Sequence, residues 1–290
     1  METGNNHTKT IHNIVDEAYN ASSTLLYHLS IQIGLNEFSY CILDLKNNKF
    51  LILKSYQYDK IFNWTQLANA IENTIKTDEM LKSKYKSVSV LLEHNQFTII
   101  PAPLFDNNNQ KDYLKFNADF EQNQSFGNDI LKSIEAHNVF VIPNVVEKLI
   151  FNYFGANKIT HHTSALIESF IKSTKNSNEK QLFVNVHVSS FDFVLIEGNK
   201  LICCNSFHVH SKEDFIYYLL FACEQFKLNP EKIKLVVSGD IEKSSDKYTD
   251  LYKYLRNVSL IGRNNASHHS YKFDEIPEHF YYNLLNHYSA

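Results

Sequence analysis

Two stretches of the chain, LSIQIGLNEFSYCILDL at residues 29–45 and LFVNVHVSSFDFVLIEG at residues 182–198, align with each other without a gap. Both begin with leucine, both have phenylalanine at the tenth place, and apolar residues alternate through the first half of each. After a turn, each continues into another apolar run, FLILKSYQY in the first copy and LICCNSFHV in the second. A repeat at a distance of about 150 residues indicates a duplicated domain rather than a solenoid.

The second copy predicts three strands in a meander, followed by helices that alternate with further strands. Ser211 and Asp214 have the spacing of a capping box, which predicts the start of a helix. The continuously apolar run KIKLVVSGD predicts a parallel strand buried on both faces. The expected elements are strands at about 182–189, 191–197, 200–207, 232–240 and 258–262, and helices at about 211–228, 245–256 and 276–288.

The first copy predicts the same opening with additional elements after it. A polar stretch at 106–125 indicates a surface loop or an insertion. The expected elements are strands at about 28–35, 38–45, 50–58, 87–93, 97–101 and 138–143, and helices at about 64–81, 127–136 and 144–153.

Three meandering strands followed by alternating helices and parallel strands resemble the ribonuclease-H-like unit, with the order β-β-β-α-β-α-β-α. Two such units in tandem are the plan of the α/β actin-like ATPase fold. The runs at 29–45 and 182–207, together with FTIIPAPLFD (97–106) and AHNVFVIPNVVEKLIF (136–151), resemble a bacterial family of unknown function assigned to that fold. The family is distantly related to actin homologues of pilus assembly and cell division, a relation of fold alone.

This resemblance implies a first unit at residues 1–178, with an insertion around 94–126, and a second unit at residues 179–290. In actin-like proteins the C-terminal helix crosses back to the first unit. We therefore expect the predicted helix 276–288 to pack on the first unit, since Phe280, Leu284 and Tyr288 form an apolar stripe along it.

The resemblance also implies a nucleotide cleft between the two units, in which hairpin amides and two aspartates hold Mg²⁺ and the phosphates. Here Gln32 and Asn185 stand at the aspartate positions, His187 replaces a glycine, and Asp240 replaces the second glycine of the adenosine turn. An amide cannot ionise to balance the charge of the metal and the triphosphate. The residues that would line a degenerate nucleotide cleft are Gln32, Gly34, Asn36, Asn185, Ser189, Ser190, Ser238 and Gly239.

The preferred interpretation is therefore an actin-like pseudo-ATPase, a non-catalytic scaffold or adaptor that binds another protein and needs no cofactor. The alternative is an ATP-dependent switch that binds ATP with Mg²⁺ and hydrolyses it weakly or not at all. The sequence favours a protein that is not an enzyme, and it leaves the oligomeric state open.

Composition excludes several other classes. The chain has 28 Lys and Arg against 32 Asp and Glu, a formal charge of −4, and no basic tract, so no nucleic-acid partner is expected. Its apolar runs are too short to span a membrane, and its polar N-terminus is unlike a signal peptide, which predicts a cytoplasmic protein. Four cysteines without CxxC spacing indicate reduced thiols.

Histidines offer a weaker candidate site. His208 and His210 alternate along a predicted strand and could meet His187 at a metal ion. No cysteine or carboxylate joins them at ligand spacing, and the chain has 14 histidines, so no metal site is predicted. The pairs at 161–162 and 268–269 are interpreted as surface residues.

Overall fold

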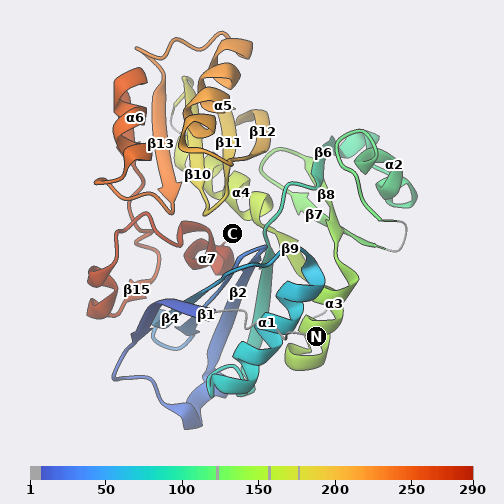
Figure 1. Cartoon of the computed structure of the whole chain (residues 1–290), viewed down its shortest axis with the longest axis vertical. Helices are drawn as coiled ribbons and strands as arrows, with labels where there is room; N and C mark the ends of the chain where they lie inside the picture. The colour runs from blue at the N-terminus through green and yellow to red at the C-terminus, as the bar shows by residue number, and fades with distance from the viewer. Residues whose placement is uncertain (1–7, 122–123, 156–157, 176, 290) are drawn as a thin grey trace.

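A computed structural model of the chain describes residues 8–121, 124–155, 158–175 and 177–289. Two large sheets lie at opposite ends of the molecule, a small sheet lies to one side, and the C-terminal segment lies between the two large sheets (Figure 1). None of the described helices is long and apolar enough to cross a membrane.

The first sheet has the strand order β1-β4-β3-β2-β5-β9, with β15 paired to β4. Its strands are β1 (Thr8–Val15), β2 (Tyr27–Gly34), β3 (Glu37–Asp44), β4 (Lys49–Tyr58), β5 (Ser87–Leu92), β9 (Ile159–His161) and β15 (His268–His269). Helices α1 (Trp64–Thr77) and α3 (Asn144–Phe154) pack together and share one apolar core with this sheet. Asn63 begins α1 as an N-cap by accepting a hydrogen bond from the Gln66 amide.

The second sheet has the order β12-β11-β10-β13-β14. Its strands are β10 (Lys180–Val186), β11 (Ser190–Glu197), β12 (Lys200–His208), β13 (Lys234–Gly239) and β14 (Asn257–Leu260). Helices α5 (Lys212–Gln225) and α6 (Asp246–Tyr254) share the core on one of its faces, and α5 begins at the predicted capping box of Ser211 and Asp214. Helix α4 (His162–Thr174) packs on the other face.

The predicted repeat is confirmed in strand order and in register. Each large sheet contains a three-stranded antiparallel meander followed by two parallel strands, β2 to β4 with β5 and β9 in one, and β10 to β12 with β13 and β14 in the other. Gln32 lies opposite Ser39, and Asn185 lies opposite Asp192, so the two hairpins keep the same spacing. The molecule therefore has the predicted α/β fold built from two equivalent units.

The predicted helix at 127–136 is wrong, whereas the predicted helix at 144–153 is confirmed as α3. Residues 127–136 are not a helix: they form the second part of β7 (Ser125–Leu131) and the turn into β8 (Ala136–Ile142). The two strands pair in a small sheet of order β6-β8-β7. A Cβ on Gly127 would come within 2.3 Å of the Phe140 ring, so a glycine is needed for this pairing. The predicted strand 138–143 belongs to this small sheet. The strand that pairs beside β5 in the first large sheet is β9 instead. Strand β6 (Phe97–Pro101) is present, and α2 (Gln110–Leu114) interrupts the expected loop.

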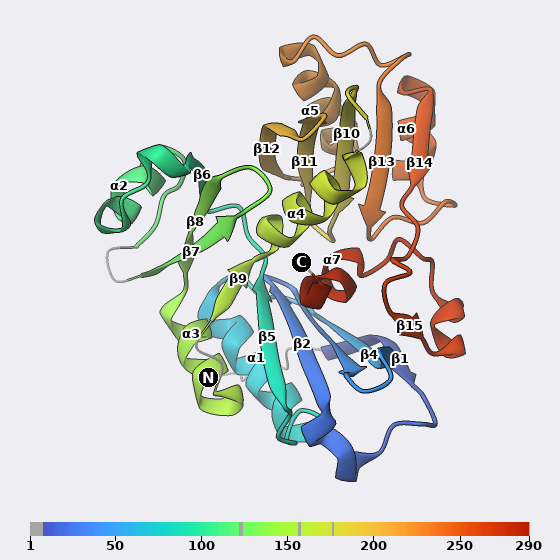
Figure 2. The same ribbon diagram turned by 180° about the vertical axis from the view of Figure 1, so that it is seen from behind.

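The C-terminal helix is shorter than predicted. The backbone of Tyr281 is left-handed, with a φ of 53°, and this breaks the expected helix 276–288, so that α7 covers only Tyr282–Asn286. Leu284 and Leu285 pack against Cys41 and Leu53 of the first sheet. Helix α7 also contacts α4, and the two helices lie together between the large sheets (Figure 2).

Candidate functional site

The turns of the two equivalent hairpins, β2–β3 and β10–β11, face each other across the middle of the molecule. The residues expected to line one nucleotide cleft are distributed over three separate hollows at this place. Only Ser238 lies outside all three, because it is buried and donates a hydrogen bond to the Asn185 side-chain oxygen at 2.8 Å.

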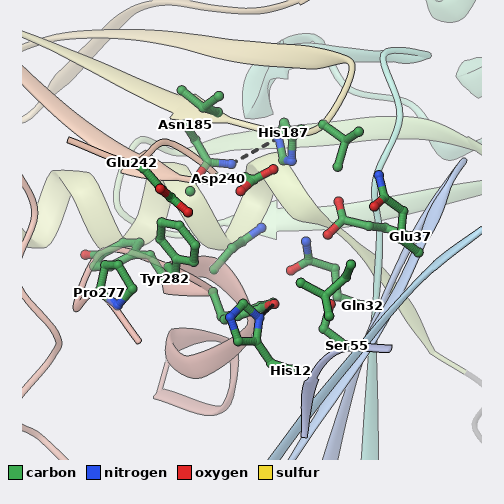
Figure 3. A pocket seen from close by; sticks show the side chains of 18 of the residues that line it. His12, Gln32, Glu37, Ser55, Asn185, His187, Asp240, Glu242, Pro277 and Tyr282 are labelled. Atoms are coloured by element: carbon green, nitrogen blue, oxygen red, sulfur yellow. Dashed lines mark hydrogen bonds between the residues drawn. The ribbon is translucent and has the colours of Figure 1, made fainter. Parts of the chain in front are cut away.

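The largest of these three hollows, which we call the acidic pocket, has a volume of about 340 Å³. Gln32 and Asn185 line it (Figure 3), and so does Gly239, as the sequence predicted for a nucleotide cleft. Gly239 has a φ of 86°, and a Cβ there would come within 2.1 Å of the Val186 carbonyl oxygen, so only glycine fits this turn.

The charge of the acidic pocket does not suit a nucleotide. Its described lining contains four carboxylates and no lysine or arginine; the carboxylates are Glu37, Asp240, Glu242 and Glu275. Burial, followed by the repulsion of Glu93, raises the pKa of Glu37 to about 8. His187, which also lines the pocket, lowers that pKa but does not outweigh burial and the neighbouring carboxylates, so the acidic groups prevail and make a poor environment for an anion.

Between the hairpin turns themselves, a cavity of only about 20 Å³ remains, which we call the hairpin cavity. Gly34, Asn36 and Ser189 line it, together with the carboxylate of Glu93. Glu93 follows β5 and reaches so close to Gly34 that a Cβ there would lie 3.2 Å from its carboxylate oxygen. The cavity has room for about one water molecule and none for a phosphate group.

A third hollow, which we call the side hollow, has a volume of about 210 Å³ and lies on the other side of Glu93. Ser189 and Ser190 line it together with His162 and Asp192. The two serines are therefore separated from Gln32 and Asn185 by the Glu93 side chain and its partners.

A buried chain of charged side chains forms the boundary between these hollows. Glu93 accepts a hydrogen bond from Gln32 at 2.9 Å, and its carboxylate lies 2.9 Å from His187 Nδ1. On its other side, His187 Nε2 lies 2.7 Å from Asp192, and Asp192 lies 3.0 Å from His162 Nε2. The chain therefore connects the end of β5 in the first sheet to β10 and β11 in the second.

The protonation of His187 follows from its neighbours. Burial alone would lower the pKa of His187, but Glu93 and Asp192 on its two sides outweigh burial and raise that pKa well above its ordinary value. The two histidines beside Asp192 hold the pKa of this carboxyl well below its usual range, despite its burial. In the metal-free protein, His187 is therefore a cation held between two carboxylates.

Sequence reasoning identified His187 but missed Glu93, His162 and Asp192. Asp192 was detectable as a carboxylate within an otherwise apolar strand, opposite Asn185. Glu93 was detectable as a carboxylate at the carboxyl end of a parallel strand, where α/β proteins place functional groups.

One prediction about the histidines is wrong. His161 and His162 are not surface residues, since their exposed fractions are 0% and 1%. His208 is exposed at the end of β12 and His210 lies beyond that strand, and within the described ranges neither joins a group that could bind a metal with His187.

The fold and the position of this site place the chain among proteins with the actin-like ATPase fold. A crystal structure from Bacteroides thetaiotaomicron, described as an actin-like ATPase fold of unknown function, superposes with a TM-score of 0.76 at 23% identity, covering 88% of this chain and 97% of that chain. The PilM–PilN type IV pilus biogenesis complex superposes with a TM-score of 0.59 at 13% identity, covering 90% of this chain and 98% of the matched chain. No curated protein shows significant similarity to the chain.

The family can be stated more narrowly than the fold. The model of a family described as protein of unknown function (DUF3822) matches residues 16–258, which is more than half of the chain. The chain belongs to this family.

Proposed function

We propose that this chain is a cytoplasmic actin-like pseudo-ATPase that acts as a non-catalytic scaffold or adaptor for another protein. The observation that carries the proposal is the Glu93 carboxylate, which lies between the hairpin turns and leaves a cavity of about 20 Å³. In an active site of this fold, the turn amides face a phosphate. Two unit charges of the same sign repel each other by about 4 kcal/mol at 4 Å in an effective dielectric of 20.

The absence of the usual carboxylates supports the same conclusion. Gln32 and Asn185 stand at the two positions that hold Mg²⁺ in this fold, and both amides are already engaged. Gln32 donates to Glu93 at 2.9 Å, while Asn185 accepts from Ser238 at 2.8 Å and donates to Asp192 at 3.3 Å. Phosphoryl transfer depends on positioned charge, and these contacts supply little of it.

A groove of about 940 Å³ between the small sheet and the second sheet offers a surface for a protein partner. Edge strands β6 and β12 both contribute to it, and among the described strands each has one unpaired side. An extended segment of another protein can pair with such an edge through its backbone. The groove also exposes Phe116 and Ile202, with 88% and 39% of their surface accessible. In the related PilM–PilN complex, an actin-like protein is associated with another protein.

The competing candidate is a nucleotide-binding switch without hydrolysis. It is favoured by the volume of the acidic pocket and by Gly239, which keeps the backbone turn that this fold uses beside adenosine. Its weakness is the same pocket's charge, with four carboxylates and no lysine or arginine in the described lining.

Calorimetric titration with ATP, ADP and GTP, each with and without Mg²⁺, distinguishes the two. The adaptor proposal expects no saturable binding at ligand concentrations up to about 1 mM, equivalent to a binding free energy weaker than about −4 kcal/mol. Saturable binding of any of these nucleotides would refute it in favour of the switch. Weakening of that binding by about 1 kcal/mol in Ser189→Ala or Ser190→Ala, the contribution of one neutral hydrogen bond, would indicate that the nucleotide binds at the side hollow and not in the acidic pocket.

The partner half of the proposal has its own test. Ile202→Asp places a charge in the groove without touching the nucleotide cleft, and Phe62→Asp changes a more exposed apolar residue elsewhere, with 78% of its surface accessible against 39% for Ile202. We expect the wild type and Phe62→Asp to capture the same proteins, and Ile202→Asp to lose them. Identical capture by all three would contradict a role for the groove.

A further inference from the structure

The buried chain of charges contains a group of side chains with the composition of a transition-metal site. His162 begins α4, His187 follows β10, and Asp192 lies in β11. One ligand atom from each lies within 4.8 Å of the other two, and all three residues are buried. This is the one such group among the residues that the structure describes.

We propose that His162, His187 and Asp192 bind a divalent transition-metal ion of the zinc type. Both histidines direct Nε2 at the same carboxylate, at 3.0 Å and 2.7 Å. Zinc lies about 2.0–2.2 Å from such nitrogen and oxygen atoms, so ligand atoms in a tetrahedral arrangement are about 3.3 Å apart. The three ligand atoms lie within 4.8 Å of one another, so His162 and His187 would have to approach each other by up to about 1.5 Å to hold the ion with Asp192.

The surroundings of the three side chains match those of a metal centre. His187 Nδ1 lies 2.9 Å from the Glu93 carboxylate, and metal-binding histidines commonly donate their second ring N–H to such a group, which fixes the tautomer. Ser206 donates to one oxygen of Asp192, and Asn185 donates to the other at 3.3 Å. A divalent ion would also balance the two negative charges of Glu93 and Asp192.

The side hollow supplies access and an open coordination position. His162 and Asp192 both line it, and its volume of about 210 Å³ can hold several water molecules. Two imidazoles and one carboxylate with an open position are a ligand set for zinc and other nitrogen-preferring transition metals. Magnesium and calcium prefer a shell of oxygen ligands, which these residues do not provide. The inference concerns a site that the proposed function does not use.

Metal titration of the purified chain, first stripped with a chelator, tests the proposal. We expect the wild type to bind one equivalent of Zn²⁺ by calorimetry, to give the visible absorption of four- or five-coordinate cobalt with Co²⁺, and to bind no Mg²⁺. His162→Gln and Asp192→Asn should abolish the saturable Zn²⁺ binding. Glu93→Gln, which leaves all three ligands in place, should weaken Zn²⁺ binding about 10- to 100-fold.

His208→Gln is the matched control, because His208 is an exposed histidine on the same hollow and not a member of the group. It should bind Zn²⁺ as the wild type does. Absence of saturable Zn²⁺ binding and of the cobalt spectrum in the wild type would overturn the proposal, and this result does not depend on whether the variants fold. Unchanged binding by His162→Gln and Asp192→Asn would overturn it as well. No step of this test involves a nucleotide, so its outcome is independent of the test of the adaptor proposal.

Discussion

Replacement of Glu93 tests whether the buried chain of charges stabilises the contact between the first and the second sheet. Glu93 belongs to the first sheet and His187 to the second, and their side chains lie 2.9 Å apart with exposed fractions of 10% and 6%. Glu93→Gln keeps the shape of the side chain but removes its charge. A hydrogen bond to a charged group contributes about 1.5–3 kcal/mol and a neutral one about 0.5–1.5 kcal/mol, so the free energy of unfolding should fall by about 1–2 kcal/mol.

Glu93→Ala should lower the free energy of unfolding by more than Glu93→Gln does. It leaves the His187 cation without one of its two carboxylates and the Gln32 amide without its acceptor. Removal of one partner from a buried ion pair costs about 3–5 kcal/mol, because the remaining charge stays buried without compensation. Removal of the Glu93 side chain would also open the space beside Gly34 to water.

The assay is urea unfolding at neutral pH in the presence of a chelator, which keeps any metal from contributing. Glu79→Gln is the control, because Glu79 pairs with Lys82 on the surface and its side chain is 83% exposed. Exposed pairs of this kind contribute little to stability, so the control should resemble the wild type. If Glu93→Gln and Glu93→Ala were both as stable as Glu79→Gln, the chain of charges would not join the sheets and the reasoning would be wrong.

Gln32→Asp together with Asn185→Asp should not create ATP hydrolysis in a phosphate-release assay, and it should lower the melting temperature, because position 32 then puts a second carboxylate against Glu93. Turnover above the wild-type rate would contradict this. Asp78→Asn should cost about 3–5 kcal/mol at pH 7, since two tyrosine hydroxyls and a lysine bind this buried carboxylate. Burial opposes ionisation there, but those partners lower the pKa of Asp78, so its contribution is present above about pH 4 and lost as the pH falls through the folded-state pKa. In urea unfolding, the difference in free energy of unfolding between the wild type and Asp78→Asn should be smaller at pH 3 than at pH 7. An equal difference at both pH values would refute the stabilising role of the ionised Asp78 carboxylate. Leu284→Ala should cost about 2–5 kcal/mol in the same assay, because Leu284 is fully buried against the first sheet, and an unchanged stability would exclude that packing as a stabilising contact.

The sequence by itself determined the duplicated hairpins, the helix that begins at Ser211 and the buried parallel strand that ends at Gly239. These features are encoded locally. Alternation of apolar residues sets which face of a strand is buried, and a capping box satisfies its helix end within four residues. The register that matches Gln32 with Asn185 followed from the same alternation.

The tertiary structure decided the conformation of the segments that connect or follow these elements. The segment 127–136 contains residues that suit a helix, but Gly127 packs beneath Phe140 and Asp129 accepts the backbone N–H of His161, contacts that only a strand provides. The C-terminal segment has a helical apolar stripe, yet Tyr281 turns the chain. In each case, partners distant in sequence outweigh a modest local propensity.

The candidate site depended on tertiary structure almost entirely. Glu93 follows β5, His162 begins α4 and Asp192 lies within β11, and each alone looks like an ordinary polar residue beside apolar ones. The sequence showed that carboxylates are missing where the fold normally has them, at Gln32 and Asn185. That another carboxylate fills the space between the hairpins, and that a histidine links it to Asp192, follows from the packing of the two sheets, since burial brings together charges that the chain keeps far apart.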